Sequence, residues 1–314
     1  MTTPKLILHG GAGSAISDRK RAEAVEEALG RVRDGLYEML SDGASANEVV
    51  VEGCRRLEDD QNFNAGTGSV LQSDGQIRMS AALMSSEESV FSGIVNATRL
   101  KNPIELAAFL QDEKDRVLAA EGATELMREL GTASYDPMTE KRLKEWIKQR
   151  KKNFDVDMAN VVSDPGAEPG HGTIGVVALD ETGEIAAATS TGGRGFERIG
   201  RVSDSAMPAG NYARPAAGVS CTGIGEDIID DCAAARIVVR VKDGMKIRRA
   251  FEKTFDEAER GERSYGAIGI DANGNLAWGK TTDILLAAWH SGRRSGHTLD
   301  LADGQIVEIR TNRE

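Results

Sequence analysis

The texture of the chain changes abruptly at residue 173. An acidic segment containing proline and glycine, Val161–Gly170, has the composition of an exposed linker. Shortly after it come two stretches of small apolar residues, Thr173–Asp180 and Ile185–Thr191, separated by a turn containing glycine. This pattern predicts a β-hairpin. Any fold of this chain must therefore place a loose segment just before a buried strand.

The bond between Gly172 and Thr173 lies at this junction. A threonine hydroxyl is a weak nucleophile until a base removes its proton, and the α-amine of an N-terminal threonine can be that base. An α-amine has a pKa of about 8, which suits the role near neutral pH. Cleavage before Thr173 would create this amine, and Gly172 can adopt the strained backbone that exposes its carbonyl to the neighbouring hydroxyl. The alternative interpretation is a β-branched residue that begins a strand, and Gly170–Thr173 taken alone favour it.

Helices and strands are expected on both sides of the junction. Apolar residues at helical spacing, a capping box at Ser45–Glu48 and a proline suited to a first helical position support this. The expected N-terminal elements are helices over 18–40, over 45–57 and from Pro103, with strands around Val70 and Ile77 joined at Asp74–Gly75. The expected C-terminal elements are helices over 226–242 and 246–260 and a hairpin of Ala267–Ile270 and Leu276–Trp278. Between the halves, residues 140–170 are expected to form a flexible linker that starts with Lys- and Arg-rich helical sequence.

Composition excludes several classes of protein. The formal net charge of -11 provides no basic footprint for nucleic acid. Cys54, Cys221 and Cys232 form no CxxC pair, and one stays unpaired under any disulfide scheme, which favours a reducing compartment. The N-terminus lacks the apolar core of a signal peptide, and no stretch approaches the length of a membrane span. We therefore expect a soluble cytoplasmic protein with no membrane or nucleic-acid partner.

Several motifs in register resemble one known family over nearly the whole chain. They are Leu8–Gly13, Phe63–Ser69, His171–Gly175, Ala188–Gly193, Gly200–Ser205 and Ser220–Glu226. In order and spacing, the sequence resembles the isoaspartyl peptidase/L-asparaginase family, the plant-type asparaginases of the threonine N-terminal-nucleophile (Ntn) hydrolases. The resemblance implies an α/β fold, a four-layer αββα sandwich forming a single domain over 1–314. Autocleavage would divide it into residues 1–172 and 173–314, and family members usually pair as dimers of such heterodimers.

The resemblance also implies roles for individual residues. Thr173 resembles the nucleophile released by cleavage after Gly172, and Thr191 resembles the residue that supports its hydroxyl. Thr222 and Gly223 resemble the oxyanion hole, where a hydroxyl and a backbone N–H meet the developing charge. The plain alternatives are strand filler for Thr191 and a simple turn at 222–225.

A second group of residues resembles the family's substrate-binding set. Arg201 matches the arginine that grips the substrate α-carboxylate, a task suited to a planar fork of donors. Asp204 matches the carboxylate that holds the α-ammonium, and Gly225 matches a backbone contact to the same amine. The alternative for the charged pair is a surface ion pair in a loop. His171 belongs to the cleavage motif, and no mechanistic role for it follows from the sequence.

The segment from residue 57 to residue 67 resembles the family's stabilising loop, in which main-chain carbonyls surround a sodium ion. Hard cations prefer such oxygen ligands. Asn64 in this loop is expected to brace the catalytic threonine. No other cofactor is expected for the chemistry. By resemblance, the carbonyls would come from Leu57, Glu58, Asp60, Phe63, Ala65 and Thr67.

The sequence departs from the family pattern in two places. Arg78–Ala81 replaces an acidic residue followed by Met/Leu-Asp-Ala, and Gly279–Asp283 replaces a Phe-Asn-Thr region. Neither change falls on the named catalytic residues, so both bear on fine substrate preference. The resemblance implies hydrolysis of L-asparagine and β-aspartyl dipeptides, and the sequence leaves the preference between them open.

The sequence argues against several other functions. Glycosylasparaginases carry His-Asp-Thr at the cleavage site and a different glycine motif at the oxyanion hole, whereas this chain has His171–Thr173 and Cys221–Gly223. Gly10–Gly13 and Gly66–Gly68 match neither the dinucleotide fingerprint nor the P-loop spacing. An α/β-hydrolase would need a GxSxG elbow, which the sequence lacks. An inactive binding module would be favoured by loss of the threonine, which is present.

Overall fold

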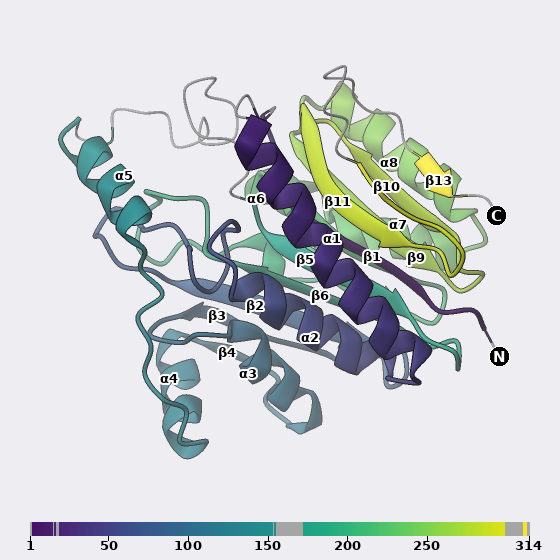
Figure 1. The fold of residues 1–314 in the computed structure, drawn as a ribbon, viewed down its shortest axis with the longest axis horizontal. Coiled ribbons are helices and arrows are strands. Elements are labelled where there is room, and N and C mark those ends of the chain that lie inside the picture. The colour runs from purple at the N-terminus through teal and green to yellow at the C-terminus, as the bar shows by residue number, and fades with distance from the viewer. Residues whose placement is uncertain are drawn as a thin grey trace.

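Two β-sheets pack face to face, and helices cover the outer face of each (Figure 1). The computed structural model describes residues 2–14, 16, 19–152, 154, 172–298 and 310–312. This is the expected four-layer αββα arrangement. Apolar clusters fill all three interfaces between the layers, because successive side chains on each strand point to opposite faces.

In its described part, the first sheet has eight strands. Every neighbouring pair is antiparallel except the last. In spatial order the strands are β12 (Ser295–His297), β11 (Ile284–His290), β1 (Lys5–Gly13), β5 (Ile174–Leu179), β6 (Ile185–Thr191), β2 (Met79–Ser85), β3 (Phe91–Ala97) and β4 (Val117–Ala119). The predicted hairpin after residue 173 is thus confirmed as β5 and β6 at the centre of this sheet.

The second sheet is antiparallel throughout and has five strands among the described residues. In order they are β13 (Arg310–Asn312), β10 (Leu276–Lys280), β9 (Tyr265–Asp271), β8 (Ala217–Gly223) and β7 (Asn211–Arg214). Strands β5 and β6 of the first sheet lie against β7, β8 and β9 of the second. Strands from before and after residue 173 therefore share one sheet and one inter-sheet core.

The outer layers are made of amphipathic helices. On the first sheet lie α1 (Arg19–Ser41), α2 (Ala46–Glu58) and α3 (Pro103–Phe109), and on the second lie α7 (Ala233–Lys242) and α8 (Ile247–Arg260). Shorter or peripheral elements are α4 (Ala120–Glu129), α5 (Glu140–Arg150), α6 (Gly225–Asp231) and the 3-10 turns η1 (Leu110–Asp112) and η3 (Asp204–Ala206). Within the part of the chain that is described, every helix is too short or too polar to cross a bilayer.

The predicted start of the second helix is confirmed in detail. The Ser45 hydroxyl accepts from the Glu48 N–H at 3.3 Å, and the Glu48 carboxylate accepts from the Ser45 N–H at 2.9 Å. Such a cap contributes about 1 kcal/mol. The third helix likewise begins at Pro103 as expected.

The prediction of strands around Val70 and Ile77 was wrong. The turn at Asp74–Gly75 exists and is closed by the Gln72 N–H, which donates to the Gln76 carbonyl at 2.9 Å, but no strand ladder extends from it and other neighbouring groups bond to distant segments. The Val70 N–H donates to the Asn64 side chain, and the Gln72 carbonyl accepts from the Trp146 indole at 2.9 Å. Tertiary partners thus replace the ladder that a hairpin would need.

The single helix expected over 226–242 is two helices. Cys232 adopts a left-handed conformation, with a φ of 49°, between α6 and α7. The next N–H groups donate outside the helix, from Ala234 to the Ala209 carbonyl and from Ala235 to the Pro208 carbonyl. Bonds to the loop before β7 therefore redirect the helix, and periodicity alone cannot show this.

The segment expected to link the two halves begins with the predicted helix, α5. Its Arg142 and Trp146 side chains are buried, and the guanidinium of Arg142 donates to the Gly68 carbonyl at 2.7 Å. This helix is therefore fixed against the 60–72 region. The later part of the expected linker, residues 155–171, lies outside the described residues and includes His171.

Candidate active site

Thr173 lies between the two sheets, immediately before β5. Its hydroxyl donates to the Thr191 hydroxyl at 3.0 Å, and the Gly193 N–H donates to the same Thr191 oxygen at 3.1 Å. Both threonines are buried, with 7% and 2% of their surface exposed. The structure therefore brings together the expected nucleophile and the residue expected to support it.

Gly172 is packed too closely for any side chain. A Cβ at Gly172 would lie 2.4 Å from the Gly11 Cα and 3.0 Å from both the Ala12 nitrogen and the Thr222 hydroxyl. Gly11 has a φ of 123°, and it lies in an irregularity of the β1–β11 register between His9 and Ala12. The bond expected to be cut therefore begins between the bulged strand β1 and β8. The sequence analysis gave Gly11 no role, although it lies in the glycine-rich segment Gly10–Gly13.

Thr222 and Gly223 approach from the second sheet, at the end of β8. Thr222 is fully buried, and its hydroxyl has no hydrogen-bond partner among the described residues. Gly223 has a φ of 132°, and a Cβ there would lie 2.5 Å from the Tyr265 Cα. Only glycine fits this position without strain.

Arg201, Asp204 and Gly225 are also brought together. A Cβ on Gly225 would lie 2.5 Å from Arg201 Nη2 and 2.7 Å from Asp204 Oδ1, so the missing side chain lets both charged groups approach the start of α6. Burial raises the pKa of Asp204 to about 6, and the nearby Arg201 charge acts in the opposite direction. Asp204 Oδ2 has no hydrogen-bond partner among the described residues.

Glu226 is a member of the site to which sequence reasoning gave no role. Its two carboxylate oxygens accept from Arg201 Nε at 3.1 Å and from Arg201 Nη2 at 3.0 Å. Burial acts to raise the pKa of Glu226, and the bonds from Arg201 outweigh it and leave the pKa below its usual value. Arg194 lies 3.4 Å from the same carboxylate. The signal was the acidic residue directly after the Gly223–Gly225 motif.

Asn64 braces the chain after Thr191. Its side-chain amide nitrogen donates to the Gly193 carbonyl at 2.7 Å, and its main-chain carbonyl accepts from the Gly192 N–H at 2.8 Å. Asn64 thus holds the 192–193 segment, whose Gly193 N–H donates to the Thr191 hydroxyl.

The loop from residue 57 to residue 68 folds back on itself and gathers backbone carbonyls. The Glu58 carbonyl accepts from the Thr67 N–H at 2.7 Å, and a Cβ on Gly66 would lie 2.4 Å from that same oxygen. A Cβ on Gly68 would lie 3.0 Å from the Phe63 carbonyl. These carbonyls pack against the glycines and N–H groups of the loop itself, and the sodium site stays a prediction. The described residues hold no group of three or more His, Cys, Asp or Glu side chains suited to a metal.

The two segments that depart from the family pattern have different surroundings. Arg78 pairs with Asp74 at 2.9 Å within its own turn. Thr281 lies against the oxyanion strand, because its hydroxyl accepts from the N–H of Tyr265, the cross-strand partner of Gly223. Lys280 donates to the Thr282 carbonyl at 2.6 Å, and burial lowers its pKa to about 8. The Gly279–Asp283 segment therefore borders the site.

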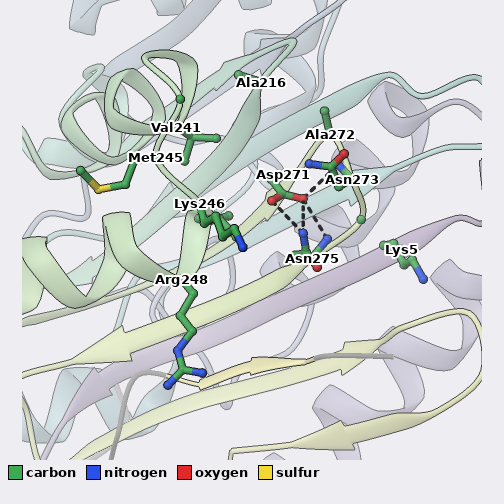
Figure 2. Close-up of a pocket in the computed structure, with 13 residues that line it drawn as sticks. Lys5, Ala216, Val241, Met245, Lys246, Arg248, Asp271, Ala272, Asn273 and Asn275 are labelled. Atoms are coloured by element: carbon green, nitrogen blue, oxygen red, sulfur yellow. Dashed lines mark hydrogen bonds between the residues drawn. The ribbon is translucent and has the colours of Figure 1, made fainter.

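A cavity of about 770 Å³ lies elsewhere, between the start of α8 and the β9–β10 turn (Figure 2). Its lining contains none of the site residues named above. Figure 2 shows Asp271 bonded within the turn, where it accepts from the N–H groups of Asn273 and Asn275 at 3.0 and 2.9 Å. Lys5 donates to the Ser291 carbonyl. The Asp271 carboxylate and the Lys5 ammonium of this cavity are thus engaged by neighbouring protein groups.

A buried threonine beside a second hydroxyl, at the start of a central strand of an αββα sandwich, defines the class of N-terminal-nucleophile hydrolases. Comparison with protein families matches residues 2–300 to the asparaginase family. An isoaspartyl peptidase/L-asparaginase of Nostoc sp. is 56% identical over 97% of both chains, and one of Synechocystis sp. is 54% identical over 96% of this chain and 92% of its own. A plant-type L-asparaginase of Thermococcus kodakarensis is 36% identical over 90% of this chain and 95% of its own. The chain belongs to the asparaginase family.

Proposed function

We propose that this chain is an amidohydrolase that cleaves itself between Gly172 and Thr173 and then hydrolyses β-aspartyl amides. Its substrates would be L-asparagine and β-aspartyl dipeptides, and one product would be L-aspartate. Family membership, the names of its similar relatives and the threonine pair support this proposal.

One observation carries the substrate assignment: two buried polar atoms at the site have no partner among the described residues. They are Asp204 Oδ2 and the Thr222 hydroxyl. Buried polar atoms are nearly always hydrogen-bonded, so two unpartnered atoms facing the nucleophile region and the charged residues call for a partner, and a bound ligand would supply one. A carboxylate oxygen suits a substrate ammonium, and a hydroxyl donor suits a developing oxyanion.

Self-cleavage would begin with attack of the Thr173 hydroxyl on the Gly172 carbonyl. An ester to Thr173 forms while the Gly172–Thr173 amide bond breaks, and the freed nitrogen takes a proton to become the α-amine. Water then hydrolyses the ester, which leaves a carboxylate on Gly172. Thr191 would hold the attacking hydroxyl in place. The resulting chains would be 1–172 and 173–314, folded as one domain.

Substrate hydrolysis would repeat this chemistry with the α-amine as base. The Thr173 oxygen attacks the β-carbonyl, the α-amine takes its proton and delivers it to the leaving nitrogen, and water releases aspartate from the ester. Thr222 and Gly223 would stabilise the oxyanion. Arg201 would hold the α-carboxylate while Asp204 and the Gly225 backbone hold the α-ammonium. Arg201 and Asp204 together would require a free α-carboxylate and a free α-ammonium on the aspartyl unit, which excludes ordinary internal peptide bonds.

Three further features belong to the same proposal. A structural sodium ion would be held by main-chain carbonyls of the stabilising loop, with no part in the chemistry. The processed protein would assemble as a dimer of two-chain units. Its location would be cytoplasmic, as the three cysteines suggest.

Three substrates at matched concentrations test the substrate class. The processed enzyme should hydrolyse β-aspartyl-leucine and asparagine and cleave a glycosylasparagine poorly. The motif residues at the cleavage site and oxyanion hole differ from those of glycosylasparaginases. A tenfold or greater preference for the glycosylasparagine, about 1.4 kcal/mol in transition-state binding, would overturn the assignment.

A further inference from the structure

A layer of polar side chains is buried between the two sheets, directly beneath the site. It consists of His9, Thr189, Asn211 and Ser220, which we call the polar layer. All four residues are fully buried. None of them has a role in the mechanism proposed above, and burying polar groups in an apolar core costs free energy unless each is paired.

The polar layer lies one side-chain repeat below the reacting groups. Thr189 precedes Thr191 by two residues on β6, and Ser220 precedes Thr222 by two residues on β8. Side chains two residues apart on a strand point to the same face. The layer and the reacting hydroxyls therefore form adjacent rows on the same inter-sheet face.

Strand β5 also faces this row, and it has a glycine, Gly175, where another residue would place a side chain. Gly175 lies two residues after Thr173 on β5 and pairs with His9 across the β1–β5 ladder. A Cβ on Gly175 would lie 2.0 Å from the Ser220 hydroxyl and 2.4 Å from His9 Nε2. The glycine is thus what allows the two polar side chains to meet beneath the nucleophile.

The side-chain hydrogen bonds of the layer cross from one sheet to the other. His9 and Thr189 belong to the first sheet, whereas Asn211 and Ser220 belong to the second. Ser220 Oγ lies 2.9 Å from His9 Nε2 and 2.7 Å from Thr189 Oγ1. Thr189 donates to Asn211 Oδ1 at 2.9 Å, and Asn211 Nδ2 donates to the Ala187 carbonyl at 3.1 Å. The layer is therefore a set of cross-links.

The donor and acceptor of each hydrogen bond in the layer follow from one group that can only accept, the Ala187 carbonyl. The Ala187 carbonyl can only accept, so the Asn211 amide oxygen faces Thr189 and takes its single hydroxyl proton. Ser220 must then donate to Thr189, and His9 must donate to Ser220 from Nε2. This order requires a neutral imidazole with its proton on Nε2. Burial lowers the pKa of His9 to about 3, so the ring is neutral near pH 7, and Nδ1 then has no hydrogen-bond partner among the described residues.

Catalysis needs groups from both sheets at a fixed separation. Thr173 precedes β5 and Thr191 ends β6, both in the first sheet. The expected oxyanion residues Thr222 and Gly223 lie at the end of β8 in the second sheet. We propose that the polar layer sets the spacing of the two sheets at the height of the nucleophile, which makes His9 and Ser220 positioning residues for hydrolysis. The inference rests on the proposed function and adds residues that act through Thr173 and Thr222.

Ser220→Ala tests this, with Ser92→Ala as the matched control. Ser92 is also a fully buried serine, on β3, and its hydroxyl bonds to the Ala107 carbonyl. In processed Ser220→Ala enzyme, kcat on β-aspartyl-leucine should fall about ten- to hundredfold, with KM within about twofold, because small misplacements of reacting groups are costly. Ser92→Ala should lose a comparable amount of thermal stability and keep its kcat. Thr189→Val provides the same kinetic test if Ser220→Ala fails to fold.

The deduced proton order gives a second readout. His9→Gln places an amide donor near the position of Nε2 and should retain far more kcat than His9→Leu, which cannot donate. Equal kcat in these two variants, wild-type kcat in Ser220→Ala, or a change confined to KM would overturn the inference. If the wild-type protein itself fails to hydrolyse β-aspartyl-leucine, the proposed function falls and this inference falls with it.

Discussion

The two halves of the site are built in opposite ways. The nucleophile region, Thr173, Thr191 and Thr222, contains only hydroxyl side chains and is almost fully buried. The substrate clamp, Arg201, Asp204 and Glu226, carries three charges, and Glu226 leaves 47% of its side chain exposed. Hydroxyls do not titrate near neutral pH, whereas burial raises the pKa of the Asp204 carboxyl to about 6.

This difference separates chemistry from recognition. Placement within a packed inter-sheet core fixes the nucleophile region, so changes there should act on cleavage and kcat. Charge fixes the substrate clamp, so changes there should act on substrate binding and respond to pH and salt. Each of the following predictions tests whether the two regions are separable in this way.

Thr173→Ala should have the largest effect. Without the hydroxyl neither self-cleavage nor hydrolysis can begin, so the variant should remain a full-length chain with no turnover. A denaturing gel and a β-aspartyl-leucine assay check both. Splitting of this variant at the same bond would show that the cleavage is not autocatalytic.

Arg201→Ala should have the next largest effect and should leave processing intact. Loss of a charge-assisted contact to the α-carboxylate should cost about 2–4 kcal/mol of transition-state stabilisation and lower kcat/KM accordingly. Arg128→Ala, which removes an exposed arginine of α4 paired with Glu125, is the control. Unchanged kinetics in fully processed Arg201→Ala protein would remove Arg201 from the substrate clamp.

The pH dependence of kcat/KM should reveal Asp204. Burial raises its pKa to about 6, so below that pH the carboxyl is protonated and loses its grip on the α-ammonium. We expect kcat/KM for asparagine to fall as the pH drops through about 6. The corresponding fall in kcat should occur at a lower pH, because the bound substrate ammonium stabilises the ionised carboxylate. Asp204→Asn should have low activity without this limb. An identical limb in that variant would assign the titration to another group.

Glu226→Gln should have the smallest effect. The amide cannot hold the Arg201 fork as firmly, but Glu226 is half-exposed, so water screens the pair and about 1 kcal/mol is at stake. We expect KM to rise roughly fivefold with kcat and processing unchanged, and the increase to shrink at high salt. Glu252→Gln on α8, which loses exposed ion pairs with Arg248 and Arg249, is the matched control. A fall in kcat without a change in KM would contradict the separation of the two regions.

How much the sequence predicted depends on the range of the interactions. Local signals were enough for the capping box at Ser45, the helix start at Pro103 and the hairpin after Thr173. The absent strands near Val70 and the break at Cys232 depend on partners distant in the chain, which periodicity does not encode. Motifs in register predicted which site residues lie together.

What the motifs missed are the residues that hold the site residues in place. Glu226 binds Arg201 across 25 residues of chain, and Ser220 meets His9 across 211. Each looks ordinary in the sequence, as an acid at a helix start and a small residue in a strand. Their roles depend on register between strands, which appears only when the sheets are assembled.

The central claim is that Thr173 becomes an N-terminal nucleophile by cleavage of the bond before it. Intact-mass analysis of purified wild-type protein tests this most directly. The account predicts two chains, one ending at Gly172 and the other beginning Thr173-Ile174-Gly175. A single mass for the whole 314-residue chain in a protein that hydrolyses β-aspartyl-leucine, or a cut at any other bond, would contradict it.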